Sequence, residues 1–516
     1  MFDYLRRLAT TGAAYTAASV FSKLIAVFLL PIYTAALSPA DYGAAEVMLA
    51  SVIAASIVIR FGLIESLLRF YYLRDTPSEQ VVRTGFAAIF WATTAGALVL
   101  LGLAEPISEA LLGEPDAELA RLAVLGLWTL TLWEYVLTLL RLDERAKAYF
   151  AITVANVVAT IPVTVWLVVV EDQGAAGILL GSFGTGAAFL LWRVAVEWRR
   201  LALSWNGPLL RRMVRFGLPT MPAELSLYSL NFIDRILIAR LAGLAEAGLY
   251  ALAIKFAQGM NVLARGFQLA WPPLAYSITD DDDARRAYSL VFTWFAAVCA
   301  FVVAGLWLLA RWIVDLLAAP EYFEAYEAVG LLTTGIALYA LYLVLVVILG
   351  RTGRTEFNLP ATIAGTAVNI ALNLILIPPL GIVGAGIALV ASYLVILVLM
   401  YVATQRLFPV PYEWGRLALL VVETAALVAG GELLLPTEGA DGFVLRLLAW
   451  LALPAVLWVS RFLSEDERRV LRTLLRPAGV RDRLQGLSAA GRGGEGDASA
   501  SSAEIYEQVK RDEDRL

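Results

Sequence analysis

The chain contains no histidine, and its single cysteine is Cys299. The absence of histidine excludes imidazole acid–base catalysis and histidine-ligated metals. A lone cysteine excludes internal disulfides and paired-cysteine metal or redox sites. Charged residues make up only 16% of the 516 residues, whereas soluble chains carry about a quarter. Cys299 lies in an apolar run and is expected to be a small buried residue. We expect no metal site and no cofactor.

Apolar residues are abundant instead. They account for 60% of the chain, and the mean hydropathy is +0.74. They recur in blocks of about twenty or more, the length that crosses about 30 Å of hydrocarbon. We therefore expect an all-α integral membrane protein with about fourteen transmembrane helices. The predicted spans are residues 12–36, 43–66, 84–104, 118–140, 148–170, 174–196, 216–240, 246–272, 288–310, 325–349, 357–378, 381–404, 415–435 and 443–463.

Loop charges predict the orientation, because cytoplasmic loops are enriched in lysine and arginine. Loops on one side of the predicted spans are basic, and loops on the other side are acidic. The basic loops include Arg69, Arg74, Arg83, Arg141, Arg145, Lys147, Arg199, Arg200, Arg211, Arg212 and Arg215, and the acidic loops include Glu105, Glu109, Glu114, Asp116, Glu171, Glu321, Glu324 and Glu432. We expect a plasma-membrane (inner-membrane) protein with both termini in the cytoplasm. The first apolar run continues through Leu37 without a convincing cleavage site, so it is expected to remain as an anchor.

An internal repeat divides the chain. Residues 37–43, LSPADYG, resemble residues 242–248, AGLAEAG. A later span opens with two glycines three positions apart in both parts, beginning at Gly174 and at Gly381. Such duplications are typical of transporters that bind their substrate between the two halves. The expected divisions are a six-helix half at 1–204, a second six-helix half at 205–406, two additional transmembrane helices at 407–463, and a cytoplasmic basic helix with a disordered tail at 464–516.

The seventh predicted span contains ionisable groups, which cost about 2.5–3.5 kcal/mol each in a membrane on insertion scales. At 100° per residue, Glu224, Asn231 and Arg235 fall on one face of this helix. Asp234 lies beside that face. The stripe is therefore expected to face a cavity or a partner inside the protein.

Cations in the first, second and eighth spans extend this pattern. Lys255 is expected near the bilayer midplane, about 13 Å along its helix at 1.5 Å per residue. Together these side chains predict a positively charged cavity that suits an anion such as a diphosphate, because arginine donates in a fork and lysine acts as a point charge. The candidate cavity residues are Lys23, Arg60, Arg69, Arg235, Lys255, Gln258 and Arg265.

Simpler structural roles remain open for several of these residues. Glu224, Asp234 and Arg235 can form ion pairs with neighbouring helices. Arg60 and Arg265 can extend to the inner interface instead of a cavity.

Two other polar features have structural explanations. Asn369 and Asn373 are expected to hydrogen-bond neighbouring helices rather than substrate. Residues 280–283 are four consecutive aspartates in a predicted inner loop. Adjacent residues cannot converge well on one ion, so a solvated loop is favoured over a metal site.

Several segments occur in a recognisable order. The seventh span begins FGLP and continues to N-x-x-DR, which ends at Arg235. The eighth contains GLYALAIKFA and ends FQLAWPPLAYS, and LLPIYTAALSPADYG, FGLIESLLRFYY and NLILIPPLGIVGAGIA occur elsewhere. On these residues the chain resembles the polysaccharide-biosynthesis flippases, which are Wzx-type translocases of lipid-linked oligosaccharides. Their superfamily also holds MATE drug exporters and lipid II flippases. The resemblance covers residues 5–463.

The resemblance implies two six-helix MATE-like halves around a central cavity, with two extra C-terminal helices. It implies that an undecaprenyl-diphosphate-linked oligosaccharide passes from the cytoplasmic to the outer leaflet by alternating access, for cell-surface polysaccharide biosynthesis. The implied partners are this lipid-linked substrate, membrane lipids and other polysaccharide-assembly proteins, with no nucleic acid. Such carriers are often thought to be coupled to a proton or sodium gradient. The candidate coupling or gating carboxylates here are Glu46, Glu134, Glu224 and Asp234.

Three competing functions are weaker. A MATE-like cation-coupled exporter of small organic compounds would favour an acidic cavity, whereas the predicted cavity has more cations than carboxylates. A membrane glycosyltransferase or polymerase usually needs a large outer loop, and the outer loops predicted here are short. A scaffold without transport is disfavoured by cations retained near the midplane. We therefore expect a transporter rather than an enzyme.

Overall fold

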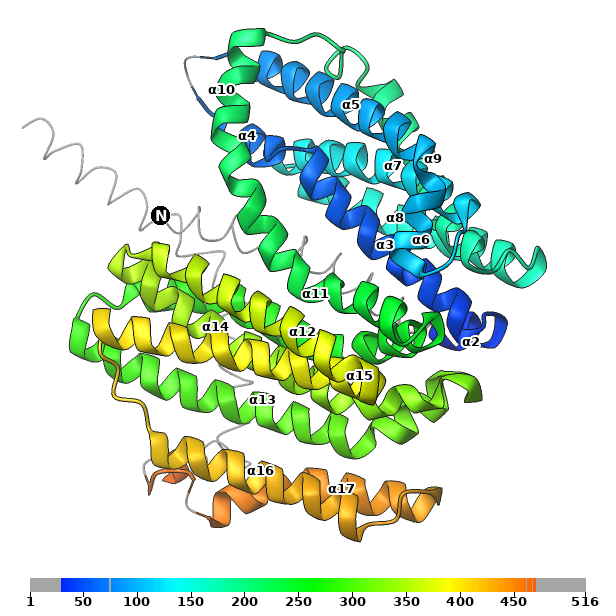
Figure 1. The fold of residues 1–516 in the computed structure, drawn as a ribbon. Coiled ribbons are helices and arrows are strands. Elements are labelled where there is room, and N and C mark those ends of the chain that lie inside the picture. Colours follow the sequence, from blue (N-terminus) through cyan, green and yellow to red (C-terminus); the bar gives the residue numbers. More distant parts are fainter. Residues whose placement is uncertain (1–28, 74–75, 461, 466, 470–516) are drawn as a thin grey trace, which may run out of the picture. The chain divides into compact units, whose positions relative to one another are not determined.

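The structure is a computed structural model that describes residues 29–73, 76–460, 462–465 and 467–469 (Figure 1). Helices account for most of these residues, and no strand occurs among them. The all-α prediction is therefore confirmed. The described residues from Leu29 to Leu451 belong to one compact unit, and Ala452 begins a second. The contacts and cavities described below lie within the first unit.

The described helices alternate with short connections. In chain order they are α2 (Leu30–Ala36), α3 (Pro39–Ile59), α4 (Leu63–Phe70), α5 (Ser78–Gly102), α6 (Ala104–Leu112), α7 (Ala117–Leu142), α8 (Ala146–Val165), η1 (Trp166–Val170), α9 (Gly174–Val196), α10 (Gly207–Gly217), η2 (Leu218–Thr220), α11 (Met221–Leu241), α12 (Leu244–Ser277), α13 (Asp281–Leu317), η3 (Pro320–Ala325), α14 (Tyr326–Thr352), η4 (Thr355–Phe357), α15 (Asn358–Leu407), α16 (Trp414–Leu434) and α17 (Gly439–Val459).

Ten candidate membrane spans occur among the described residues, judged by length and apolar composition. α15 has 50 residues and a non-helical backbone at Gly381, so it covers the two predicted spans 357–378 and 381–404. α11 and α12 are not among the ten, since charged and amide side chains lower their hydropathy. The protein is a multi-pass membrane protein, and the number fourteen stays a prediction.

The predicted span 43–66 is wrong as a single helix. α3 ends at Ile59, and the next helix, α4, begins at Leu63. Between them Phe61 and Gly62 adopt left-handed backbone angles, with φ of 48° and 66°. Two successive left-handed residues cannot continue a right-handed helix. Arg60 consequently caps the end of α3 instead of lying inside a span.

The helices pack as two groups. The N-terminal group comprises α2 to α10, and the C-terminal group comprises α11 to α15 (Figure 1). α3 contacts α7 and α9 of its own group and also packs along α11 and α12. It therefore forms much of the surface on which the two groups meet.

The internal repeat has matching backbone geometry in the two groups. Gly174 and Gly381 both have φ of 53°, a conformation that glycine adopts without steric cost. Gly174 faces the carboxylate of Asp41, and Gly381 faces that of Glu246, which also accepts a hydrogen bond from the Ile382 N–H (3.3 Å). This correspondence supports the repeat, while the division at 204/205 stays a prediction.

The two LSPADYG-like segments meet each other. A Cβ atom on Gly43 would overlap the carbonyl oxygen of Leu244, and one on Gly248 would overlap that of Pro39. Only glycine permits the starts of α3 and α12 to approach this closely. The repeated glycines thus form a backbone contact between the two groups.

Candidate functional site

Glu46 of α3 binds two cations from the C-terminal group. Its Oε1 lies 2.6 Å from Nζ of Lys255 in α12, and its Oε2 lies 3.2 Å from Nη1 of Arg235 in α11. Lys255 also donates a hydrogen bond to the Tyr42 hydroxyl. The Glu46, Arg235 and Lys255 side chains are 9%, 13% and 22% exposed. Two cations and one carboxylate leave one positive charge in excess at this largely buried place.

Arg60 occupies a second cluster near the other end of α3. Its guanidinium pairs with Glu134 of α7 and with Glu224 of α11. Glu65 of α4 adds a third carboxylate, close enough to repel the other two electrostatically. Arg60 is buried among these helices.

The charged stripe of α11 faces α3. Arg235 pairs with Glu46, and Glu224 pairs with Arg60, so the two helices run in opposite directions. Glu46 and Arg60 are fourteen positions apart, which separates the two clusters by about 21 Å along α3. Every predicted cavity cation in these two clusters is therefore bound to a predicted coupling or gating carboxylate.

Asp234 faces away from α3. Its carboxylate accepts hydrogen bonds from the Tyr250 hydroxyl (2.8 Å) and from Nδ2 of Asn373 (2.6 Å). Nδ2 of Asn373 also donates to Oδ1 of Asn369 (3.1 Å). Asp234 is 1% exposed, and no lysine or arginine within the described ranges forms an ion pair with it. Of the four candidate carboxylates, Asp234 is the one held by neutral groups.

The remaining predicted cavity residues do not join these clusters. Arg69 is exposed on α4, with its guanidinium 4.3 Å from the centre of the Phe216 ring. Arg265 is also exposed and donates to Gln268 (3.2 Å), while Gln258 is half-buried one turn after Lys255. Lys23 lies outside the described residues.

Further hydrogen bonds join the two helix groups beyond the Glu46 cluster, at the predicted outer side. They are Ala319 N–H to Thr34 Oγ1 (3.0 Å), the Tyr322 hydroxyl to Leu37 O (3.0 Å), and Arg240 Nη1 to Glu109 O (2.6 Å). Together with the Gly43–Gly248 contact, these bonds hold the groups together at that side.

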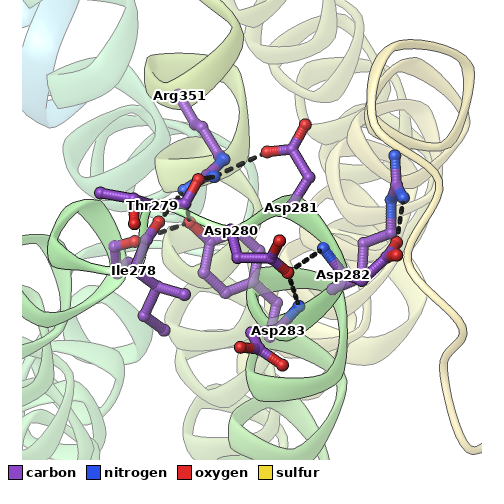
Figure 2. Close-up of polar contacts among 10 residues, drawn as sticks. Ile278, Thr279, Asp280, Asp281, Asp282, Asp283 and Arg351 are labelled. Carbon is purple, nitrogen blue, oxygen red and sulfur yellow. Dashed lines mark hydrogen bonds and ion pairs between the residues drawn. The ribbon is translucent and has the colours of Figure 1, made fainter.

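The four aspartates begin a helix rather than form a loop. Asp280 caps α13 by accepting the N–H groups of Asp282 (3.0 Å) and Asp283 (2.9 Å). Asp281 pairs with Arg351 at 2.7 Å, as Figure 2 shows. The expected solvated loop is thus corrected to a capped first turn, because the aspartate carboxylates favour the helix N-terminus. Within the described part of the chain, no group of three potential ligands could hold a metal.

An apolar cavity of about 810 Å³ lies among α13, α14, α15 and α16. Its lining extends along α16 from Trp414 to Glu432, about 27 Å at 1.5 Å per residue. Cys299, which is buried, lines it as well. At one end Glu432 pairs with the fully buried Arg446 of α17 (2.5 Å).

Several residues that interact with the charged side chains described above were not predicted from the sequence. Tyr42 precedes Glu46 by one helical turn, a spacing that places both on one face and is readable in the sequence. Arg446 is an arginine inside the predicted span 443–463, which marks it as a candidate for pairing. Glu65 carried the same signal as an ionisable residue in the predicted span 43–66, but the break after α3, which directs it toward Glu134 and Glu224, was not predictable.

Comparison with known proteins identifies the family. The sequence profile of the family described as polysaccharide biosynthesis protein matches residues 35–325. The chain belongs to this polysaccharide biosynthesis protein family. The match begins near the end of α2 and includes both charged clusters on α3. The family predicted from the sequence motifs is therefore confirmed.

This polysaccharide biosynthesis protein is similar in sequence to a curated relative, the succinoglycan biosynthesis transport protein ExoT of Rhizobium meliloti (strain 1021). The two are 28% identical over 325 residues, which cover 59% of this chain and 61% of the relative. The match thus spans less than two thirds of the relative's length.

Solved structures share the fold. The lipid II flippase MurJ, in an inward closed conformation, matches with a TM-score of 0.68 at 10% identity, covering 86% of this chain and 99% of MurJ. An inward-facing multidrug resistance MATE family transporter of the MOP superfamily matches with a TM-score of 0.61 at 16% identity, covering 78% and 95%. At these identities the similarity establishes the fold alone, and the MATE-like fold prediction is confirmed.

Proposed function

We propose that this protein moves an undecaprenyl-diphosphate-linked oligosaccharide from the cytoplasmic to the outer leaflet of the plasma membrane, by alternating access, for cell-surface polysaccharide biosynthesis. The observation that carries the proposal is the buried cluster of Glu46, Arg235 and Lys255, with its excess positive charge, in a member of the polysaccharide biosynthesis protein family. The descriptions of MurJ as a lipid II flippase and of ExoT as a transport protein for succinoglycan biosynthesis support it.

The excess charge suits a diphosphate. Arg235 offers a forked set of donors and Lys255 a point charge, both of which bind phosphate oxygens well. Both cations already have an anionic partner in Glu46, which a diphosphate would replace or share. The surroundings are largely buried, so the interaction is weakly screened.

The lipid part of the substrate has a matching environment. The apolar cavity beside α16 is long enough, at about 27 Å, to receive much of a hydrocarbon chain. Its lining is almost wholly apolar, so it favours hydrocarbon over the glycan. We assign it to the polyprenyl tail of the substrate while the tail remains continuous with the bilayer.

The ion pairs between the helix groups act as gates. Glu46 bridges α3 to α11 and α12, and Arg60 bridges α3 to Glu224 of α11. Separation of the groups at either end of α3 must break the pair at that end. In the present arrangement the hydrogen bonds at the predicted outer side are formed, which corresponds to a closed outer gate.

A disulfide across this outer contact should stop transport. Thr34 and Ala319 are close enough for Thr34→Cys and Ala319→Cys to be joined, in a background where Cys299 is replaced by serine. Oxidation is expected to lower glycan export at least about tenfold, by holding the outer gate closed, and reduction should restore it. Each single-cysteine variant should be insensitive to oxidant. Full export by the oxidised double variant would show that this side does not open.

Asp234 is the proposed coupling carboxylate. A charge buried among neutral groups is costly, so binding of a proton or a sodium ion there is favourable. Glu46, Glu134 and Glu224 already have arginine or lysine partners, which reduces that tendency. We therefore place Glu46, Glu134 and Glu224 in gating and Asp234 in coupling to the ion gradient.

Deletion of the gene should cause a lipid-linked saccharide to accumulate on the cytoplasmic leaflet. The accumulated lipid, extracted and analysed by mass spectrometry, identifies the glycan. Re-expression of the wild-type chain should clear it. If drug sensitivity changes and no such lipid accumulates, export of small organic compounds replaces this proposal.

A further inference from the structure

A second cavity, of about 340 Å³, lies between the start of α5 and the segment that precedes α10. Its lining is polar and apolar in about equal parts and includes Gln80, Arg83, Ser204, Trp205 and Asn206. It lies beside the basic loops, at the predicted cytoplasmic side. None of the candidate residues discussed above contributes to it.

The walls of this cavity are fixed by the fold. The Asn206 N–H donates to Thr84 Oγ1 (3.2 Å), and Oδ1 of Asn206 accepts from the Leu209 N–H to cap α10 (3.1 Å). Just upstream, Arg200 donates to both carboxylate oxygens of Asp143 (2.5 and 2.7 Å), and these hydrogen bonds lower the pKa of Asp143. The cavity is thus held in shape without a ligand.

The chemistry of the lining selects a neutral polar ligand. Nη2 of Arg83 pairs with Glu79 (2.5 Å), so the cavity offers no clear excess of charge for a diphosphate. The amides of Gln80 and Asn206 and the Ser204 hydroxyl provide both donors and acceptors.

Trp205 adds an aromatic surface, and this residue is 57% exposed. A sugar ring has an apolar C–H face and a rim of hydroxyl groups that both donate and accept hydrogen bonds. The flat indole of Trp205 can pack against the C–H face of the sugar, and the polar side chains around it can hydrogen-bond to the sugar hydroxyl groups. The cavity volume lies in the usual range for small-molecule sites, about 300–1,000 Å³.

We propose that this cavity binds a sugar residue of the lipid-linked glycan at the cytoplasmic side, before the glycan passes between the helix groups. The inference rests on the proposed function and adds a place where the glycan, rather than its diphosphate, is recognised. Trp205 stacks on the sugar ring, while Arg83 and Gln80 bind its hydroxyl groups.

Binding of two probes to the purified full chain tests this assignment. One probe is the lipid-linked saccharide extracted from the deletion strain, and the other is undecaprenyl diphosphate without sugar. Trp205→Ala should raise the Kd of the saccharide probe about tenfold, as expected for loss of one stacking contact, and leave the Kd of the sugar-free probe unchanged. Trp198→Ala is the matched control, since Trp198 is exposed in the same segment but does not line the cavity.

The possible results separate the two proposals. A wild-type chain that binds neither probe overturns the proposed function and, with it, this inference. A wild-type chain that binds both, with Trp205→Ala unchanged or equally weakened for both probes, overturns the sugar site alone. Trp205→Phe should retain most of the saccharide affinity, because it keeps an aromatic face.

Discussion

Export of the lipid-linked glycan is expected to fall about 100-fold when Lys255 or Arg235 is replaced by alanine, from the ~3 kcal/mol that a hydrogen bond to a charged group contributes. Either change removes the single excess positive charge of the Glu46 cluster. The remaining cation still pairs with Glu46, so no buried charge is left alone and the protein should fold. The loss therefore reports on substrate binding and passage rather than on stability.

The measurement is the amount of glycan exported by a null strain that carries each variant, with membrane protein levels matched. Arg285→Ala is the control, because Arg285 pairs with the exposed Asp282 on the first turn of α13. Lys255→Arg should recover part of the export, since it keeps the charge but changes the donor geometry. Full export by both alanine variants would remove Arg235 and Lys255 from the site.

Asp234→Asn is expected to uncouple export from the ion gradient. Asparagine preserves the size of the side chain but cannot bind a proton and binds a cation weakly. The rate should fall about tenfold, within the 1–3 kcal/mol typical of coupling between sites. An ionophore that collapses the gradient should lower export by the wild type and have no further effect on the variant.

Asp282→Asn serves as the control, because Asp282 is an exposed aspartate outside the buried network. Comparison of proton-selective and sodium-selective ionophores identifies the coupling ion. A variant that keeps a full, ionophore-sensitive rate would exclude Asp234 from coupling, and Glu46, Glu134 and Glu224 would then be tested in turn.

Hydropathy located the helices because apolar blocks and helix length are both dictated by membrane thickness. The predicted span 174–196 coincides with α9 (Gly174–Val196), which a glycine begins. The break after α3 was not predictable in this way. A Cβ atom on Gly62 would overlap the backbone of Gly217 in α10, so that break depends on a contact between distant parts of the chain.

The sequence was sufficient to predict the candidate residues, but not the residues with which they interact. Helical periodicity places Glu224 and Arg235 on one face without saying that both meet α3. It also places Asp234 beside Arg235, although a difference of 100° sends the two side chains to different neighbours. Arg235 meets Glu46, and Asp234 meets Tyr250 and Asn373. Pairing depends on packing, which one sequence does not encode locally.

The backbone contact between Gly43 and Gly248 has a mechanical consequence. It lies near one end of α3, a rod of 21 residues or about 31 Å. Ile59, the last residue of α3, lies 16 residues or about 24 Å beyond Gly43, so with this contact as the pivot a rotation of about 15°, the size seen between subunits of allosteric proteins, moves that end of α3 by about 6 Å. A small rotation of α3 about the two glycines would thus open a gap of several ångströms beside Arg60. Residues larger than glycine at position 43 or 248 would therefore be expected to prevent this rotation of α3.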